Sequence, residues 1–192
     1  MQAQDVLDFW FLPPGSEGHG KQRAEWFRKD EAFDAALRER FGVLVNQAVA
    51  GGLREWDEQW PRGTLARILL LDQFTRNAYR GKPEAFGGDL LALLAARQLV
   101  DAGADKTLSP VERMFVYLPF EHAEDAAMQE LSVSLFTELA QAHEGFTEVL
   151  DYAHRHRGVI ARFGRFPHRN AILGRASTPE ELAFLELPGS SF

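Results

Sequence analysis

Residues 64–77 read TLARILLLDQFTRN, and this stretch decides the fold. Apolar residues occupy every side of a helix built from residues 65–74, a pattern typical of a helix enclosed by protein on all faces. Asp72, Arg76 and Asn77 would therefore project from a buried helix. Burying an uncompensated charge is costly, so we expect these side chains to pair with one another or with a ligand.

Helical signals continue on both sides of this stretch. Apolar residues recur every three or four positions from residue 30 to residue 51. Two capping boxes, at residues 109–112 and 178–181, mark helix starts. We predict that Pro119 limits the first of these helices to about two turns, and that residues 120–143 form the longest helix. No segment alternates with a period of two, which indicates an all-α fold of antiparallel helical hairpins or a bundle.

The composition fits one all-helical domain over residues 1–192. Apolar residues make up 45% and charged residues 26% of the chain, as in ordinary soluble globular proteins. The absence of cysteine excludes disulfides and cysteine nucleophiles, and it favours a cytoplasmic location. No apolar run approaches the roughly 20 residues of a membrane-spanning helix. The net charge of −7 argues against sequence-independent binding of nucleic acid.

Two further groups of polar residues interrupt apolar helical faces. The first group lies at the start of the predicted 120–143 helix and consists of Glu121, His122, Glu124 and Asp125. The second group is His156 and Arg157, which lie between apolar positions of a later helix. One interpretation is a structural network that ties helices together. The other is a functional site, because inward charges of both signs accumulate at such sites.

The segment from residue 152 to residue 179 is unusual in its charge. It contains six arginines and three histidines but no Asp or Glu. Arginine side chains, with exposed backbone N–H groups near Gly164 and Gly174, would suit a carboxylate or a phosphate. Alternatively, these arginines cap helix ends and pair with the acidic residues 121–125. Arginine interleaved with phenylalanine also resembles a surface for single-stranded nucleic acid, but the net negative charge of the chain argues against that function.

Metal binding and the familiar catalytic motifs have little support. His122 with Glu121 and Asp125 supplies suitable ligand types, as do the three histidines of the basic segment. Neither the His-Glu-x-x-His helix nor the paired Glu-x-x-His spacing of di-iron bundles occurs. The chain has no P-loop, no Gly-x-Gly-x-x-Gly and no Gly-x-Ser-x-Gly. We therefore predict no metal site and no cofactor.

Five strings of residues carry a resemblance that covers nearly the whole chain. They are VLDFWF at 6–11, LLDQFTRN at 70–77, YLPFEHAED at 117–125, RFGRFPHRN at 162–170 and LGR at 173–175. With these strings the chain resembles a bacterial family known as domain of unknown function 924. The resemblance implies a right-handed α-superhelix of stacked antiparallel hairpins, related to tetratricopeptide-like folds. It implies no activity and no catalytic residues.

We expect a protein that binds a small anionic molecule, a phosphate or a carboxylate, in a pocket rich in arginine and histidine, with hydrolase or transferase activity as an extension. The expected ligand-binding residues are Asp72, Arg76, Asn77, Glu121, Arg157, Arg162, Arg165, His168, Arg169, Asn170 and Arg175. The candidates for proton transfer are His122, Asp125 and His168, with the histidines favoured because histidine titrates near neutral pH. The alternative is a tetratricopeptide-like scaffold that binds a peptide or a partner protein on its concave face.

Overall fold

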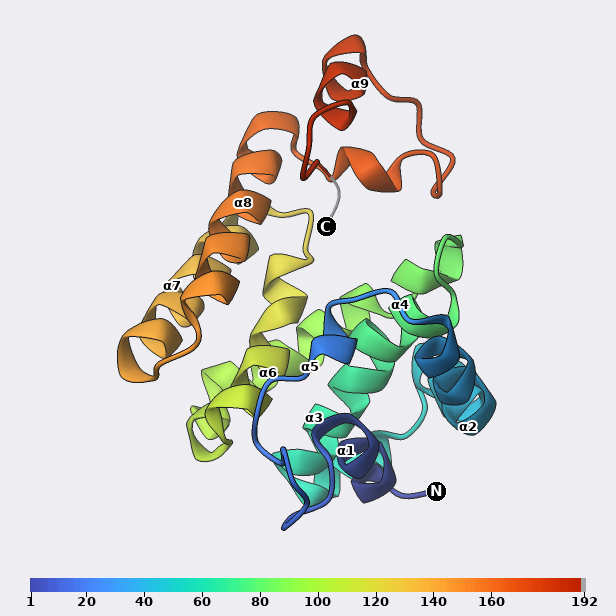
Figure 1. The fold of residues 1–192 in the computed structure, drawn as a ribbon, viewed down its shortest axis with the longest axis vertical. Coiled ribbons are helices and arrows are strands. Elements are labelled where there is room, and N and C mark those ends of the chain that lie inside the picture. The colour runs from blue at the N-terminus through green and yellow to red at the C-terminus, as the bar shows by residue number, and fades with distance from the viewer. Residues whose placement is uncertain (191–192) are drawn as a thin grey trace. The chain divides into compact units, whose positions relative to one another are not determined.

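The computed structural model describes residues 1–190 and contains helices but no strands in that range (Figure 1). The α-helices are α1 (Ala3–Phe11), α2 (Glu31–Val49), α3 (Arg62–Ile68), α4 (Thr75–Ala78), α5 (Asp89–Asp101), α6 (Pro110–Glu121), α7 (Ala126–Ala142), α8 (Thr147–Phe163) and α9 (Pro179–Leu185). A π-helix, η3 (Leu69–Phe74), joins α3 to α4. Short 3-10 helices lie between these elements: η1 (Ala24–Trp26), η2 (Arg54–Gln59), η4 (Pro83–Phe86), η5 (Ala104–Thr107) and η6 (Pro167–Arg169). The prediction of an all-α fold is confirmed.

The chain divides into two compact units. Unit 1 comprises Met1–Arg80 and Glu84–Pro119, and unit 2 comprises Gly81–Pro83 and the residues from Phe120 onward. The single domain expected from the sequence stays a prediction. None of the helices in residues 1–190 combines the length and the apolar character needed to cross a lipid bilayer.

The core of unit 1 is aromatic. The ring centroid of Trp10 lies 5.2 Å from that of Phe74 and 5.5 Å from that of Phe115. Phe41 of α2 contacts Phe74 at 5.3 Å. All four side chains are fully buried. Aromatic pairs of this kind add about 0.5–1.5 kcal/mol each beyond the burial of their area, so α1, α2, η3 and α6 are held around one centre.

The central stretch of residues 64–74 is buried along its whole length, as its apolar pattern predicts. Its second half widens into the π-helix η3, whose backbone hydrogen bonds span five residues instead of four. Side chains one turn later also donate to two carbonyls of this segment. Thr75 Oγ1 donates to Leu71 O at 2.9 Å, and Arg76 Nη1 donates to Asp72 O at 2.6 Å. The widened turn is thus stabilised by the polar residues that follow it.

The predicted stop at Pro119 is wrong, because α6 continues through this proline to Glu121. A proline inside a helix removes one hydrogen bond and crowds the preceding turn. The neighbouring Phe115 and Phe120 are both fully buried, so tertiary packing holds the helix together across the proline. The capping box at its start is present: Ser109 N donates to Glu112 Oε2 at 3.0 Å and Glu112 N to Ser109 Oγ at 3.4 Å.

The predicted helix over residues 120–143 is also wrong at its beginning. α7 begins at Ala126, after a short non-helical connection. Asp125 caps α7 by accepting a hydrogen bond from Met128 N at 2.9 Å. The buried Gln129 donates through Nε2 to the carbonyls of Glu121 at 2.6 Å and Ala123 at 2.8 Å, so these groups bond to a side chain instead of to a helix. Glu124 and Asp125 therefore lie in the connection between α6 and α7. α2, with 19 residues, is longer than α7, with 17.

Unit 2 is built on the hairpin of α7 and α8, which lie side by side (Figure 1). α8 ends at Gly164, which has a left-handed conformation with φ of 69°. The chain then runs through η6 and a loop to the second capping box. There Glu181 N donates to Thr178 Oγ1 at 3.2 Å, and Thr178 N donates to Glu181 Oε2 at 2.7 Å. Both capping boxes predicted from the sequence are confirmed.

Candidate functional site: a histidine cluster in unit 2

Three of the predicted ligand-binding residues lie in unit 1 and pair with protein groups there. Arg76 Nη1 lies 3.2 Å from Asp72 Oδ1, and the same guanidinium donates to both oxygens of Asp89 at 2.9 and 3.2 Å. Asn77 Nδ2 donates to Asp34 Oδ1 at 2.7 Å. These contacts fit the interpretation of Asp72, Arg76 and Asn77 as part of a structural network.

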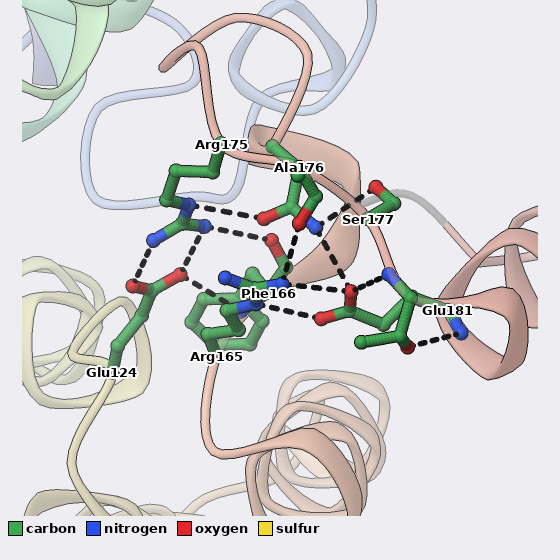
Figure 2. A network of polar contacts seen from close by, with 9 residues as sticks. Glu124, Arg165, Phe166, Arg175, Ala176, Ser177 and Glu181 are labelled. Carbon is green, nitrogen blue, oxygen red and sulfur yellow. Dashed lines mark hydrogen bonds and ion pairs between the residues drawn. The ribbon is translucent and has the colours of Figure 1, made fainter.

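Two arginines of the basic segment in unit 2 each bind the carboxylate of a glutamate through two guanidinium nitrogens (Figure 2). Arg165 Nε and Nη2 donate to Glu181 Oε1 and Oε2 at 2.6 and 2.8 Å. Arg175 Nη1 and Nη2 donate to Glu124 Oε2 and Oε1 at 2.6 and 2.9 Å. Bidentate pairs of this kind combine the strength of charged hydrogen bonds with fixed geometry. We call these four residues the ion-pair frame.

The ion-pair frame also holds the loop that follows α8. Glu124 Oε1 accepts a hydrogen bond from Phe166 N at 2.8 Å, and Arg175 Nη2 donates to Phe166 O at 3.1 Å. Asn170 is fully buried between the two pairs, donating to Glu181 Oε2 at 3.3 Å and accepting from Arg175 Nε at 3.0 Å. Arg165, Asn170 and Arg175 therefore position the loop through protein–protein contacts.

The backbone N–H groups near the loop glycines were expected to be exposed donors, and this expectation is wrong. Gly164 N donates to Ile160 O at 2.8 Å, closing the end of α8. Gly174 N donates to Ala171 O at 3.4 Å. Both glycines have positive φ, and the turns that this conformation allows direct their N–H groups back to carbonyls of the preceding residues.

Three predicted residues lie toward the surface of unit 2. Arg157 pairs with Glu130 at 3.2 Å with 39% of its side chain exposed, so it is not on the inner face of α8 where it was expected. The turn of about 100° per residue carries it away from the buried face that its neighbour His156 occupies. Arg162 pairs with Glu180 at 2.8 Å, and its side chain is 47% exposed. Exposed pairs of this kind contribute about 0–1 kcal/mol. The third residue, Asp125, is the exposed cap of α7.

The remaining predicted residues gather around the buried ring of Phe166. The ring centroids of His156 and His168 lie 5.4 and 5.7 Å from that of Phe166, and Arg169 Cζ lies 4.6 Å from it. The rings of His122 and His156 are 6.2 Å apart, and Arg169 Nη2 donates to His122 O at 3.1 Å. Glu121 Oε1 lies 3.1 Å from His156 Nδ1. We call this set the histidine cluster: Glu121, His122, His156, His168 and Arg169.

His156 is the innermost histidine of the cluster, with 4% of its surface exposed. Burial, together with the positive charges of His122, Arg169 and His168, lowers the pKa of His156 to about 3. The ring is therefore neutral near pH 7. Its Nδ1 lies 2.9 Å from Tyr152 O, an obligate acceptor, which assigns the single ring proton to Nδ1. His156 is therefore a fixed neutral group near pH 7.

The family of the chain follows from the match of its sequence. Residues 6–189 match the family described as bacterial protein of unknown function (DUF924). The chain belongs to this family. The DUF924 chain is similar to a solved structure, that of the protein of unknown function ATU0120 from Agrobacterium tumefaciens. The two share 40% sequence identity over 96% of each chain with a TM-score of 0.81, so they share the fold. No curated protein matches the chain.

Sequence reasoning missed two residues that build the site of this DUF924 protein. Gln129 fixes the connection that carries Glu121 and His122, but a single polar residue within a helix gives no signal of such a role. Glu181 appears in the sequence only as part of a capping box, although it also accepts from Arg165 and Asn170. The excess of arginine before it was the available signal, since partly buried arginines such as Arg165 require acceptors.

The ion-pair frame predicts a specific response to acid. Hydrogen bonds from Arg165 lower the pKa of Glu181 to about 2, although burial opposes them. The stability from such a carboxylate is complete above its ordinary pKa of 4.5 and is lost as the pH falls toward 2. We expect Glu181→Gln to lower the Tm at pH 7 and to reduce the further loss of Tm between pH 5 and pH 2.5. Circular dichroism melts at half-unit steps of pH measure both effects.

Glu180→Gln is the matched control for this prediction. Glu180 precedes Glu181 in the chain, and its pair with Arg162 is largely exposed. We expect its Tm profile to run parallel to that of the wild type. Some acid response remains in Glu181→Gln, since the hydrogen bonds from Arg175 and Phe166 N also lower the pKa of Glu124, against the raising effect of burial. Parallel profiles for Glu181→Gln and the wild type would contradict the assigned role of Glu181.

Proposed function

We propose that this DUF924 protein binds a small anion, a phosphate or a carboxylate, at the histidine cluster of unit 2. The observation that carries the proposal is the charge around Phe166. One arginine and two protonatable histidines surround a neutral, buried His156, and Glu121 is the one acidic member of the cluster. Burial is the main cause of the low pKa of His156, and the positive charges of His122, Arg169 and His168 lower it further. A site of this sign favours a negatively charged ligand.

The ion-pair frame restricts which residues would contact the anion. Arg165 and Arg175 already donate two hydrogen bonds each to the carboxylates of Glu181 and Glu124. The residues proposed to contact a ligand are His122, His168 and Arg169, the basic side chains of the histidine cluster other than the buried His156. Arg169 is 6% exposed, so its charge acts in surroundings that screen it less than water does.

A chemical role would use the same cluster. His122 or His168 would take a proton from a water or alcohol that attacks a bound phosphate or carboxylate ester, or would give one to the leaving-group oxygen. Attack by water would make the protein a hydrolase, and attack by an alcohol would make it a transferase. Glu121 and Tyr152 O would keep His156 oriented beside them. Binding of an anion without catalysis requires only the positive charge of the histidine cluster.

The test is a sulfate titration followed by 15N NMR at pH 6.0 and pH 8.0. Sulfate keeps its charge of −2 over this range, so a change in affinity reports on the protein. We expect amide shifts in residues 164–170 and tighter binding at pH 6.0, because histidine side chains ordinarily gain charge between these pH values. His168→Gln should weaken binding by about fivefold or more, as expected for loss of a charged hydrogen bond.

His154→Gln is the matched control, because His154 lies on α8 with its side chain exposed and outside the cluster. We expect its affinity for sulfate to stay within about twofold of the wild type. Equal affinities for the wild type and His168→Gln, or shifts that avoid residues 164–170, would overturn the proposed site. A repeat with acetate distinguishes a preference for carboxylate.

A second candidate function is that of a scaffold for peptides, as the tetratricopeptide-like superhelix implied by the family resemblance would suit. The observation that favours it is a groove of about 620 Å³ in unit 1. Apolar Met1, Val43 and Leu53 line it together with Glu55 and Glu58. Val43 is 71% exposed. We propose that this groove binds a peptide of alternating apolar and basic residues. Val43→Asp should abolish binding of a fluorescein-labelled Leu/Lys peptide. The control is Leu90→Asp, a change at a similarly exposed residue outside the groove, which should retain binding.

A further inference from the structure

Unit 1 contains a pocket that neither the histidine cluster nor the peptide groove includes. It has a volume of about 280 Å³ and lies among η2, α3 and α5. Its lining includes three arginines, one from each of these elements: Arg54, Arg67 and Arg97. This volume lies just below the roughly 300–1,000 Å³ of typical small-molecule sites, so the pocket would suit a small ligand.

Arg67 is a buried cation in the wall of this pocket. Its side chain is 7% exposed, and Nη1 donates to the carboxylate of Asp57. Thr64 Oγ1 donates to the other oxygen of Asp57 at 2.8 Å, which fixes that carboxylate. Arg67 Nε is buried and has no hydrogen-bond partner among residues 1–190. A buried donor without an acceptor costs free energy, and the charge of the Arg67 guanidinium would attract an anion in the pocket that Arg67 lines.

The other charges of the lining are also predominantly positive. Arg54 and Arg97 are exposed, and neither forms an ion pair with any residue in the part of the chain that the structure describes. Asp101 is the one acidic side chain among the lining residues. The three arginines therefore exceed the local negative charge even after the pair between Arg67 and Asp57.

The remaining wall of the pocket is apolar. Leu91 and Leu94 of α5 line it, and Leu94 is 48% exposed. An exposed leucine beside a cluster of arginines can cover an alkyl chain while the arginines hold an anionic head group. Because cationic and apolar walls lie this close together, we propose that the pocket binds a small amphiphilic anion, a carboxylate or phosphate head on a short alkyl chain.

The test is a comparison of hexanoate, hexyl phosphate and acetate as probes, titrated against the 15N-labelled full chain. We expect shifts at the amides of η2 and α5. Hexanoate should bind about tenfold or more tightly than acetate, because each buried methylene adds to affinity. Arg97→Gln should weaken hexanoate by about fivefold or more. Arg97 is exposed and makes no ion pair, so this variant keeps the fold.

Arg38→Gln is the matched control, an exposed helical arginine of unit 1 outside the pocket with the same change of charge. Its affinity for hexanoate should stay within about twofold of the wild type. Leu94→Ser should abolish the preference for hexanoate over acetate without changing the affinity for acetate. Equal losses in Arg97→Gln and Arg38→Gln, or equal binding of hexanoate and acetate by the wild type, would overturn the proposal.

This site is independent of the proposed function. His168→Gln should leave the affinity for hexanoate in the unit 1 pocket unchanged, and Arg97→Gln should leave the sulfate shifts of residues 164–170 unchanged. Failure of one site in these titrations therefore does not count against the other. A preference for hexyl phosphate over hexanoate would identify the head group as a phosphate, and the reverse would identify it as a carboxylate.

Discussion

Replacing Gly63 with alanine is expected to destabilise the protein by about 3 kcal/mol or more. A Cβ atom at this position would lie 1.8 Å from Trp56 O and 2.8 Å from Trp56 C. Both are backbone atoms, so the clash cannot be relieved by rotating a side chain. Either η2 or the start of α3 must move, and α3 leads into the buried centre of unit 1. Urea denaturation should show a lower midpoint, and the Tm should fall by about 6 °C or more.

Gly158→Ala is the matched control and should change stability in the opposite direction. Gly158 lies in the interior of α8, and a Cβ there would meet no atom within 4 Å. Alanine is more favourable than glycine inside a helix by about 0.8–1.0 kcal/mol. We expect a Tm equal to or above that of the wild type. If Gly63→Ala had the same Tm as the wild type, the close approach of η2 to α3 would be absent in solution.

Replacing Phe166 with alanine is expected to destabilise unit 2 by about 3–5 kcal/mol. Phe166 is fully buried, and its ring contacts His156, His168 and Arg169. Removing it leaves a cavity and takes the cation–π partner from Arg169. The histidine cluster would lose the surface around which it is arranged. We therefore expect sulfate binding at residues 164–170 to be lost together with stability.

Phe163→Ala is the control for the loss of a ring in the same segment. Phe163 is only partly buried and packs against Phe184 with ring centroids 5.1 Å apart. Its removal should cost less than half as much as that of Phe166, and it should leave sulfate binding within about twofold of the wild type. Urea denaturation and the NMR titration measure the two effects separately. Equal costs for the two variants would contradict the central place given to Phe166.

Helix starts and the burial of the central stretch could be predicted because they depend on residues close in sequence. Capping boxes such as Thr178–Glu181 close over three residues, and the apolar character of residues 64–74 is visible in one window. The connection from Glu121 to Asp125 could not be predicted in this way. Its shape depends on Gln129, whose side chain competes with the helical bonds of carbonyls up to nine residues away.

The candidate site was located by its charge but not by its contacts. The excess of arginine and histidine in the basic segment correctly marked a dense polar region. The sequence left open whether the arginines bind a ligand or the acidic residues of the protein, because arginine binds a ligand anion and a protein carboxylate in the same way. The structure pairs Arg175 with Glu124 across 51 positions of the chain and Arg165 with Glu181 across 16. His122, His168 and Arg169 are the members of the histidine cluster that we propose to meet an anion.

By itself, the sequence determined that the chain is helical, where the two helices with capping boxes begin, which helix is enclosed and where positive charge concentrates. These properties arise from interactions within a turn or two and from composition, so they need no knowledge of distant partners. Only the tertiary structure decided which arginine meets which carboxylate, that Arg67 lines a pocket, and that Gly63 faces a carbonyl while Gly158 faces open space. The physical reason is that a side chain's partner and the room around it depend on which distant segments pack beside it.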